Sequence, residues 1–406
     1  MKLLNNAKRR FLCIIAIIVL SSIVLAACGP QRVTTQAKPK PTVSPTPTPV
    51  STGVPINRVP STPTPTPIVL PNVPTLGIDG KPPNGYPGIP WLRLSYPSCG
   101  ASGNVSGSAL KNRILHYHLL GIHILLIVCQ VQDGPALFQT NWLNDAAQGG
   151  ADAVQCGNEQ MKINTFTTYI PPADFARFYD LCQRAIHAVR PDVPVLVGSL
   201  DPHVGGVDYQ PLVDQANYLN SMQYAMNTQV HPGGNWNWRS QTVGLIDSWH
   251  NGYPNASVNS LYGLFSFWAQ QFQVDLNSGG LGKHIWVIEG TGCFQGCGLD
   301  PYNPYEIAVS HILTLITDVQ TAMRYHVPFF YFSDRDFPDE GTFWPIGILD
   351  ANGHSKPLRQ DLPMGARTLT LSCTGKQVTV ADQEQLLAKL YAGCALPGNY
   401  IGILTS

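Results

Sequence analysis

Two glutamates stand at the ends of short apolar runs in distant parts of the chain. Glu159 closes the segment ADAVQCGNE at residues 151–159, and Glu289 closes KHIWVIE at residues 283–289. Such runs indicate buried parallel strands, and a carboxyl group at the end of a buried strand is held rigidly while facing a cleft. Two carboxyl groups that share one site are what cleavage of a glycosidic bond requires. Either glutamate alone could instead be a loop residue or a salt-bridge partner.

The elements that would hold these glutamates alternate along the chain. From about residue 76, strand-like apolar runs alternate with longer segments of helical spacing, as in a parallel sheet with crossover helices. Strands are expected at residues 76–79, 88–97, 122–130, 151–159, 193–200, 243–249, 283–289 and 327–333. Helices are expected at residues 108–120, 137–147, 172–189, 209–229, 259–274 and 305–325. This order fits a (β/α)8 TIM barrel, with an irregular first unit because residues 80–87 leave no room for a full helix.

Residues 1–27 have the features of a secretory signal. Four basic residues, at positions 2, 8, 9 and 10, precede an uncharged apolar run at 11–25, and the sequence Leu-Ala-Ala-Cys ends at Cys28. This end resembles the lipobox of bacterial lipoproteins, which implies cleavage before Cys28 and a lipid on its thiol. We therefore expect an extracytoplasmic protein anchored to the bacterial cell membrane. The alternative is an uncleaved transmembrane anchor, although the run is shorter than the ~20 residues that a span needs.

Two further boundaries follow from composition. Residues 28–75 are rich in Pro, Thr and Ser. Proline restricts φ and lacks an N–H, so we expect this tract to be an extended linker. The barrel is expected at residues 76–365. Residues 366–406 are expected to form a small C-terminal α+β appendage of two short strands and a helix.

The charge balance restricts the partners of this protein. The 406 residues contain 25 Lys and Arg and 25 Asp and Glu, and only 12% of the residues are charged. The absence of a basic stripe argues against nucleic acid as a partner. We expect a monomer that needs no cofactor and binds an oligosaccharide or polysaccharide.

The cysteines indicate disulfides. Eight cysteines remain beyond the signal and Cys28, and an even number outside the cytoplasm favours disulfide bonds. The expected pairs are Cys293 with Cys297 and Cys373 with Cys394. A metal site at Cys293 and Cys297 is the alternative, but no second Cys or His pair with zinc-like spacing accompanies it.

Two other groups of side chains are candidates for ligand binding. Trp236 and Trp238 lie in a loop rich in Gly and Asn, where exposed indoles would stack on sugars. The alternative is that they pack against the neighbouring helix. His116, His118 and His123 are close in sequence, but the expected helix and strand separate them, which disfavours a metal cluster. Trp286 and the aromatic run at 329–332 are expected in the core, because strand residues alternate between faces.

Five segments, taken in chain order, resemble clan A of the glycoside hydrolases. They are GIPWLRL at 88–94, GNE at 157–159, WHNGYP at 249–254, IWVIEG at 285–290, and GILD through KP at 347–357. The resemblance covers roughly residues 88–362. It implies a retaining enzyme that carries an Asn-Glu pair after barrel strand 4 and a nucleophilic Glu after strand 7.

The resemblance also implies roles for individual residues. Glu159 would be the acid/base and Glu289 the nucleophile of a double displacement, with their carboxyl groups ~5–5.5 Å apart. Asn158 would bind the 2-hydroxyl of the sugar, and Arg93 would support Glu289, although a buried Arg can also be a structural ion-pair residue. Further substrate contacts are expected from the end of strand 6, where the alternative is strand capping: Trp249, His250 and Tyr253.

Besides its irregular first unit, the chain departs from that pattern at two places. Gln160 stands where many members have Pro, which should alter only the loop. Phe332, Ser333 and Asp334 stand where many members end strand 8 with a Trp, so the sugar platform of the family is in doubt. Two non-enzymatic alternatives follow: a catalytically silent carbohydrate-binding lipoprotein, and a surface or cell-wall scaffold that uses the barrel only as a shape.

Overall fold

A computed structural model describes most of the chain from residue 76 onward. The described residues are 76–96, 105–130, 141–161, 169–200, 203–204, 208–209, 212–247, 261–291, 299–300, 303–307, 309–339, 342–344, 346–356, 358–364, 368–370 and 376–379. They all belong to the second of two units into which the chain divides, residues 66–406. The signal, the linker and Cys28 lie outside the described residues. No helix within the described ranges is long and apolar enough to cross a bilayer.

Eight parallel strands close a barrel in the order β1-β12-β9-β8-β5-β4-β3-β2. They are β1 (Leu76–Asp79), β2 (Trp91–Ser95), β3 (His123–Val128), β4 (Ala153–Cys156), β5 (Val195–Leu200), β8 (Thr242–Asp247), β9 (Ile285–Gly290) and β12 (Phe329–Tyr331). All eight fall on or within one residue of the expected segments. The predicted TIM barrel is therefore confirmed.

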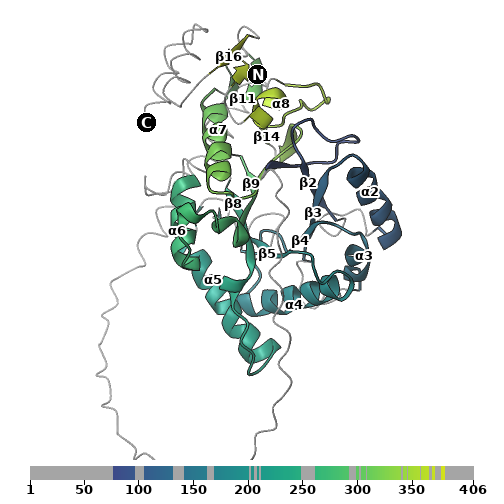
Figure 1. Ribbon diagram of the computed structural model, residues 1–406, viewed down its shortest axis with the longest axis vertical. Coiled ribbons are helices and arrows are strands. Elements are labelled where there is room, and N and C mark those ends of the chain that lie inside the picture. Colours follow the sequence, from purple (N-terminus) through teal and green to yellow (C-terminus); the bar gives the residue numbers. More distant parts are fainter. Residues whose placement is uncertain are drawn as a thin grey trace, which may run out of the picture. The chain divides into compact units, whose positions relative to one another are not determined.

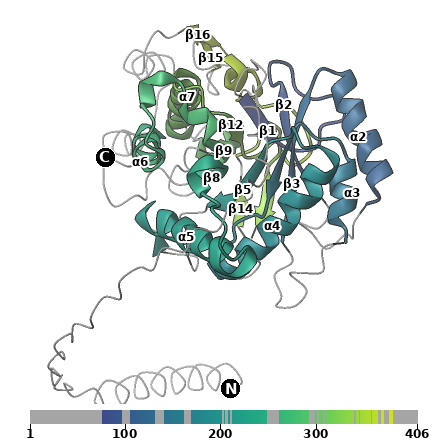
Figure 2. The same ribbon diagram turned by 60° about the horizontal axis from the view of Figure 1, so that its bottom comes forward.

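Helices cover the outside of the barrel. They are α2 (Gly107–Leu119), α3 (Leu143–Gln148), α4 (Pro172–Val189), α5 (Leu212–Ala225), α6 (Leu261–Phe272) and α7 (Val309–Arg324). Figures 1 and 2 show them following one another around the strands. Between β1 and β2, residues 80–90 form turns and an isolated bridge from Tyr86 to Ile89 instead of a helix. The expected irregularity of the first unit is thus observed.

The other described elements are short strand pairs and short helices. The strand pairs are β6–β7 (His203–Val204, Asp208–Tyr209), β10–β11 (Leu299–Asp300, Asn303–Ile307), β13–β14 (Phe337–Asp339, Thr342–Trp344) and β15–β16 (Thr368–Thr370, Gln377–Thr379). The short helices are η3 (Met226–Val230), η4 (Trp238–Ser240), η6 (Leu276–Ser278), η7 (Leu281–Lys283), α8 (Leu358–Asp361) and η8 (Leu362–Met364). The first three pairs follow β5, β9 and β12, so they belong to the loops at the carboxyl ends of the strands. The pair β15–β16 contains the two strands expected in the C-terminal appendage, and its expected helix lies outside the described residues.

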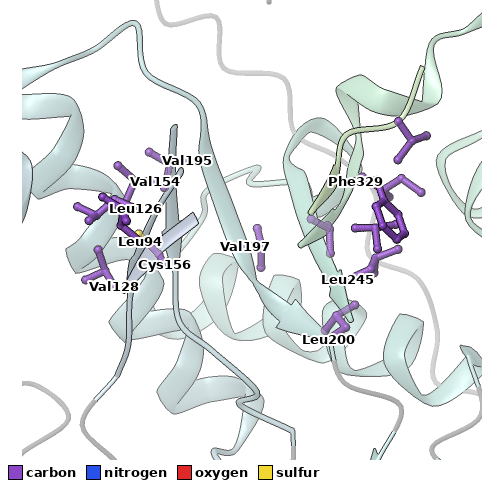
Figure 3. Close-up of a cluster of buried hydrophobic side chains, with 14 of the residues drawn as sticks. Leu94, Leu126, Val128, Val154, Cys156, Val195, Val197, Leu200, Leu245 and Phe329 are labelled. Carbon is purple, nitrogen blue, oxygen red and sulfur yellow. The ribbon is translucent and has the colours of Figure 1, made fainter. Parts of the chain in front are cut away.

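The core has two layers that the strands separate. Side chains on the outer face, such as Leu126, Val154 and Leu245, pack beneath the helices (Figure 3). A second cluster fills the barrel interior: Trp91, Leu125, Ala153, Leu196, Trp286, Ile288 and Phe330. Trp286 and Phe330 stack with ring centroids 6.1 Å apart and are 2% and 1% exposed. Their predicted core location is confirmed, and they close the barrel interior to solvent at this level.

One disulfide connects the barrel wall to its helical cover. Cys156 of β4 is bonded to Cys182 of α4, 26 residues later, and both residues are completely buried. Cys156 belongs to the outer layer of the core, which faces the helices. This pair was not expected from the sequence, and the expected pairs, Cys293 with Cys297 and Cys373 with Cys394, lie outside the described residues. Cys129 is also disulfide-bonded.

Removal of this disulfide is expected to destabilise the barrel. In the variant Cys156→Ala/Cys182→Ala the free energy of unfolding should fall by about 3 kcal/mol, because the bond restricts a 26-residue loop in the unfolded chain. Calorimetry should therefore record a melting temperature that is lower by about 6–12 °C. As a control, a reductant should lower the melting temperature of the wild type more than that of the variant. Equal melting temperatures of variant and wild type would contradict the prediction.

Candidate active site

A layer of polar side chains lies next to the apolar cluster of the barrel interior, nearer the carboxyl ends of the strands. Asp79 of β1 is paired in register with Arg93 of β2. Side chains of a strand alternate between its two faces, so Arg93 points inward as Trp91 does, and Gln155 of β4 points inward as Ala153 does. Arg93 is 1% exposed and Gln155 is completely buried. Charged and amide groups therefore line the barrel at the carboxyl ends of its strands, where TIM barrels hold their sites.

Arg93 is the centre of this layer. Its Nη1 lies 2.6 Å from Oε1 of Glu289 and 2.6 Å from Oδ2 of Asp79. Its Nη2 donates to Oδ1 of Asn158 at 3.0 Å, and its Nε donates to Oε1 of Gln155 at 3.1 Å. One guanidinium thus connects β1, β2, the end of β4 and β9. It brings together three residues that the sequence predicted for the site, namely Arg93, Asn158 and Glu289.

A bulge in β9 turns Glu289 toward Arg93. Val287 belongs to the outer layer of the core and Ile288 to the inner cluster, so regular alternation would point Glu289 outward. The pairing with β8 instead runs from Leu245 with Val287 to Ile246 with Glu289, which leaves Ile288 as an extra residue. The same shift occurs against β12. Such bulges re-aim side chains, and Glu289 consequently faces the interior with 12% of its side chain exposed.

A second bulge, in β5, positions Ser199. The register between β5 and β8 shifts around Gly198, whose φ of 44° lies in the left-handed region that glycine tolerates. Ser199 Oγ accepts the backbone N–H of Glu159 at 2.7 Å and donates to Oδ1 of Asn158 at 3.1 Å. The sequence reasoning missed Ser199. The signal that could have found it is the Gly-Ser pair inside an otherwise apolar run.

The turn after β4 holds Asn158 and Glu159 in a constrained conformation. Gly157 has a φ of 96° and Glu159 a φ of 48°. A Cβ at Gly157 would meet the ring of Phe175 at 2.5 Å, so only glycine fits there. Gln130 clamps Asn158, since its Oε1 accepts the backbone N–H at 2.8 Å and its Nε2 donates to the carbonyl at 2.7 Å. A left-handed non-glycine residue costs about 1 kcal/mol or more, and such strain gathers at functional sites.

Asp79 is the second carboxylate that contacts Arg93. Burial raises the pKa of Asp79 to about 6, Arg93 opposes this shift, and the negative charges of Glu289 and Asp334 add to it. The backbone N–H of Asp334 donates to the carbonyl of Asp79 at 2.8 Å, and the Asp334 carboxylate accepts from the Tyr86 hydroxyl at 3.0 Å. The sequence reasoning did not single out Asp79, although it closes an apolar run as Glu159 and Glu289 do.

The two loop tryptophans are not part of this layer. Trp238 is completely buried, donates from Nε1 to Asn220 at 3.0 Å and packs edge-on against Phe272. Trp236 is half-buried and packs edge-on against Tyr179. Sugar stacking is therefore wrong for Trp238, and the alternative, packing against helices, is observed for both tryptophans. Their loop connects α5 to β8, and it lies at the amino end of β8, whereas Glu289 lies at the carboxyl end of β9.

The histidines lie apart from the polar layer. His118 Nε2 is 2.8 Å and His123 Nδ1 3.4 Å from the carboxylate of Asp152, and His116 contacts the carbonyl of Pro83. His123 begins β3, so this group surrounds the amino ends of the strands. In the part of the chain that the structure describes, no group of three or more His, Cys, Asp and Glu could hold a metal ion.

Gln160 does more than alter the loop after β4. Its side chain is completely buried, and its Oε1 accepts the backbone N–H of Ser199 at 3.2 Å. Phe332, at the position of the missing Trp, packs edge-on against Phe337 with centroids 5.4 Å apart. Three expected substrate contacts lie outside the described residues: Trp249, His250 and Tyr253.

Comparisons with known proteins concern the fold alone. No protein-family model matches the chain, and no curated protein matches it. A glucosidase from Croceicoccus marinus is 12% identical, with a TM-score of 0.47 over 76% of this chain and 70% of its own. A β-mannanase of Thermomonospora fusca, solved with mannotriose, is 12% identical, with a TM-score of 0.42 over 71% of this chain and 88% of its own. The catalytic domain of a mannanase from Streptomyces sp. SirexAA-E is 13% identical, with a TM-score of 0.40 over 68% of this chain and 76% of its own.

Proposed function

We propose that this protein is a retaining glycoside hydrolase that cleaves β-glycosidic bonds of an oligosaccharide or polysaccharide. The observation that carries the proposal is the position of Arg93. Its guanidinium lies 2.6 Å from Glu289 and 3.0 Å from Asn158, the residue before Glu159. One buried cation therefore ties the segments of both glutamates to the same end of the barrel. This supports a shared site for two carboxyl groups, which glycosidic cleavage needs.

In the proposed first step, Glu289 attacks the anomeric carbon of the sugar. The ion pair with Arg93 holds the carboxylate of Glu289 in place, and the carboxylate is the nucleophilic group. Glu159 donates its proton to the glycosidic oxygen, and the leaving sugar departs. In the second step Glu159 takes a proton from water, and the hydroxide displaces Glu289 from the anomeric carbon. Two inversions give net retention, for which we expect carboxyl groups ~5–5.5 Å apart.

The hydrogen bonds of Asn158 support a role in binding a sugar hydroxyl. Its Oδ1 accepts from Arg93 at 3.0 Å, from Gln155 at 3.0 Å and from Ser199 at 3.1 Å. Three donors on one oxygen determine the orientation of the amide. Its Nδ2 is therefore the atom that can donate to a substrate, and we propose that it binds the 2-hydroxyl of the sugar.

Further parts of the proposal rest on the sequence. Trp249, His250 and Tyr253 follow β8, which pairs with the strand of Glu289, and this order supports them as substrate contacts. The lipobox-like end at Cys28 supports a lipid anchor in the bacterial cell membrane, with the barrel outside the cytoplasm.

The second candidate function is a carbohydrate-binding lipoprotein without activity, which the same polar site could also serve.

Product stereochemistry tests the proposal. The wild type is offered a panel of aryl β-glycosides, and NMR follows the anomer that forms first on the substrate that it cleaves. We expect the β anomer, and we expect a 2-deoxy-2-fluoro β-glycoside of the same sugar to label the peptide that carries Glu289. The variant Glu289→Gln should stay unlabelled. An α anomer formed first contradicts retention, and a protein that binds oligosaccharides but is inert across the panel is the binding lipoprotein instead.

A further inference from the structure

Asp79 has no role in the mechanism above, although it contacts Arg93 as closely as Glu289 does. Each carboxylate has an oxygen 2.6 Å from the same atom, Nη1 of Arg93. This nitrogen carries two hydrogens, so it can donate one to each carboxylate. The Nε and Nη2 atoms of Arg93 donate to the amide oxygens of Gln155 and Asn158. The two carboxylates therefore share one edge of a single cation.

The shared contact with Arg93 affects both carboxylates because all three groups are largely buried. Arg93 is 1% exposed, Glu289 is 12% exposed and Asp79 is 17% exposed. With both carboxylates ionised, two negative charges face one positive charge, and a low-dielectric site makes this excess costly. The charge on one carboxylate must then influence the other.

The charged groups around Asp79 come from three elements. Arg93 faces it from β2, Glu289 faces it from β9, and Asp334 faces it from the segment after β12. The carboxylate of Asp334 is held by the hydroxyl of Tyr86 at 3.0 Å. Asp79 thus lies among one cation and two anions. Of the two anions, Glu289 shares the cation with it.

We propose that Asp79 is a positioning residue for the nucleophile: it holds Nη1 of Arg93 between β1 and β9 and sets how much positive charge Arg93 presents to Glu289. This inference rests on the proposed function, with Glu289 as the nucleophile. When Asp79 is ionised, it competes with Glu289 for Nη1 of Arg93 and repels the charge on Glu289, which makes Glu289 more nucleophilic. When Asp79 is protonated from solvent, Arg93 pairs with Glu289 alone, and Glu289 is a weaker nucleophile.

The variant Asp79→Asn tests this proposal. Asparagine keeps an acceptor for Nη1 and removes the charge, so Arg93 should pair more strongly with Glu289. The readout is kcat/KM against pH, measured on an aryl glycoside that the wild type cleaves. The inflection near pH 6 that the ionisation of Asp79 contributes in the wild type should disappear. On the plateau kcat/KM should fall by about three- to tenfold.

Two further variants separate charge from position. Asp79→Glu keeps the charge and displaces the carboxylate by one methylene, so an acidic inflection should remain while kcat/KM falls. Asp334→Asn is the matched control, because it removes a neighbouring carboxylate that is bonded to Tyr86, and the inflection near pH 6 should remain. Loss of the inflection in Asp334→Asn or in Asp79→Glu, or its persistence in Asp79→Asn, would overturn the proposal.

The labelling of Glu289 distinguishes this inference from the function on which it rests. If the wild type is inert, or if the fluoroglycoside labels another residue, the proposed function fails. If Asp79→Asn is still labelled at Glu289 and melts like the wild type but keeps its pH profile, only the role of Asp79 fails. Circular dichroism of each variant verifies the fold, and Asp79→Glu provides the comparison if Asp79→Asn does not fold.

Discussion

Replacement of Glu289 by glycine is expected to lower kcat/KM on every cleavable aryl glycoside by a factor on the order of 10⁵. The reason is that both steps of the proposed double displacement pass through an ester on Glu289. The loss should not depend on the leaving group, since no glycosyl-enzyme forms with any of them. Azide should restore activity by entering the vacated space and attacking the anomeric carbon, and the product should be the α-glycosyl azide.

Glu159→Ala provides the contrast that assigns the two roles. Its loss should be about 10²–10⁴ for sugars with poor leaving groups, which need a proton. The loss should be much smaller for leaving groups such as dinitrophenolate, which need none. Azide should here yield the β-glycosyl azide, since the nucleophile is intact. Asp192→Asn, at an exposed carboxylate, is the control. If both glutamate variants gave the α product, or if neither responded to the leaving group, the assignment would be wrong.

The second large effect is expected at Arg93. Replacement of Arg93 by methionine leaves Glu289 and Asp79 as buried carboxylates without their cation. Removal of one partner from a buried ion pair costs about 3–5 kcal/mol. Urea unfolding at pH 7 should record this loss. The kcat/KM should fall at least about 100-fold, because Glu289 loses its ion pair and Asn158 loses one of the three donors that orient its amide.

Two substitutions serve as controls for Arg93. Arg190→Met removes an arginine that is paired with Asp192 at the surface, with side chains 40% and 67% exposed. Its cost should be less than about 1 kcal/mol. Arg93→Lys should fall between the two, because one ammonium group cannot reach the four partners of the guanidinium. An Arg93→Met variant as stable as the wild type would show that the cation is not needed.

The sequence predicted the elements and the end of the barrel that carries the candidate site. Alternating apolar runs and helical segments predicted the TIM barrel, because both periodicities are local properties of the chain. The helix at 172–189 was predicted to the residue, since the prolines at 171 and 172 define its start. Parallel strands end at the same rim, so Glu159 and Glu289 could be assigned to one end of the barrel without a structure.

Packing between distant segments decided what the sequence reasoning missed or misread. The motif alone indicated sugar stacking for Trp238, but the loop reaches the amino end of β8, where the indole fills the core. The disulfide joins Cys156 to Cys182 because β4 faces α4, whereas eight cysteines permit many pairings.

The orientation of Glu289 depended most on tertiary structure. Regular alternation after Val287 and Ile288 would point Glu289 outward, toward the helices. Only the pairing of β9 with β8 and β12 creates the bulge that turns it toward Arg93. The sequence by itself thus determined which residues reach the rim of the barrel. The register between strands decided which of them face each other, because a bulge is a mismatch between two strands and neither strand alone contains it.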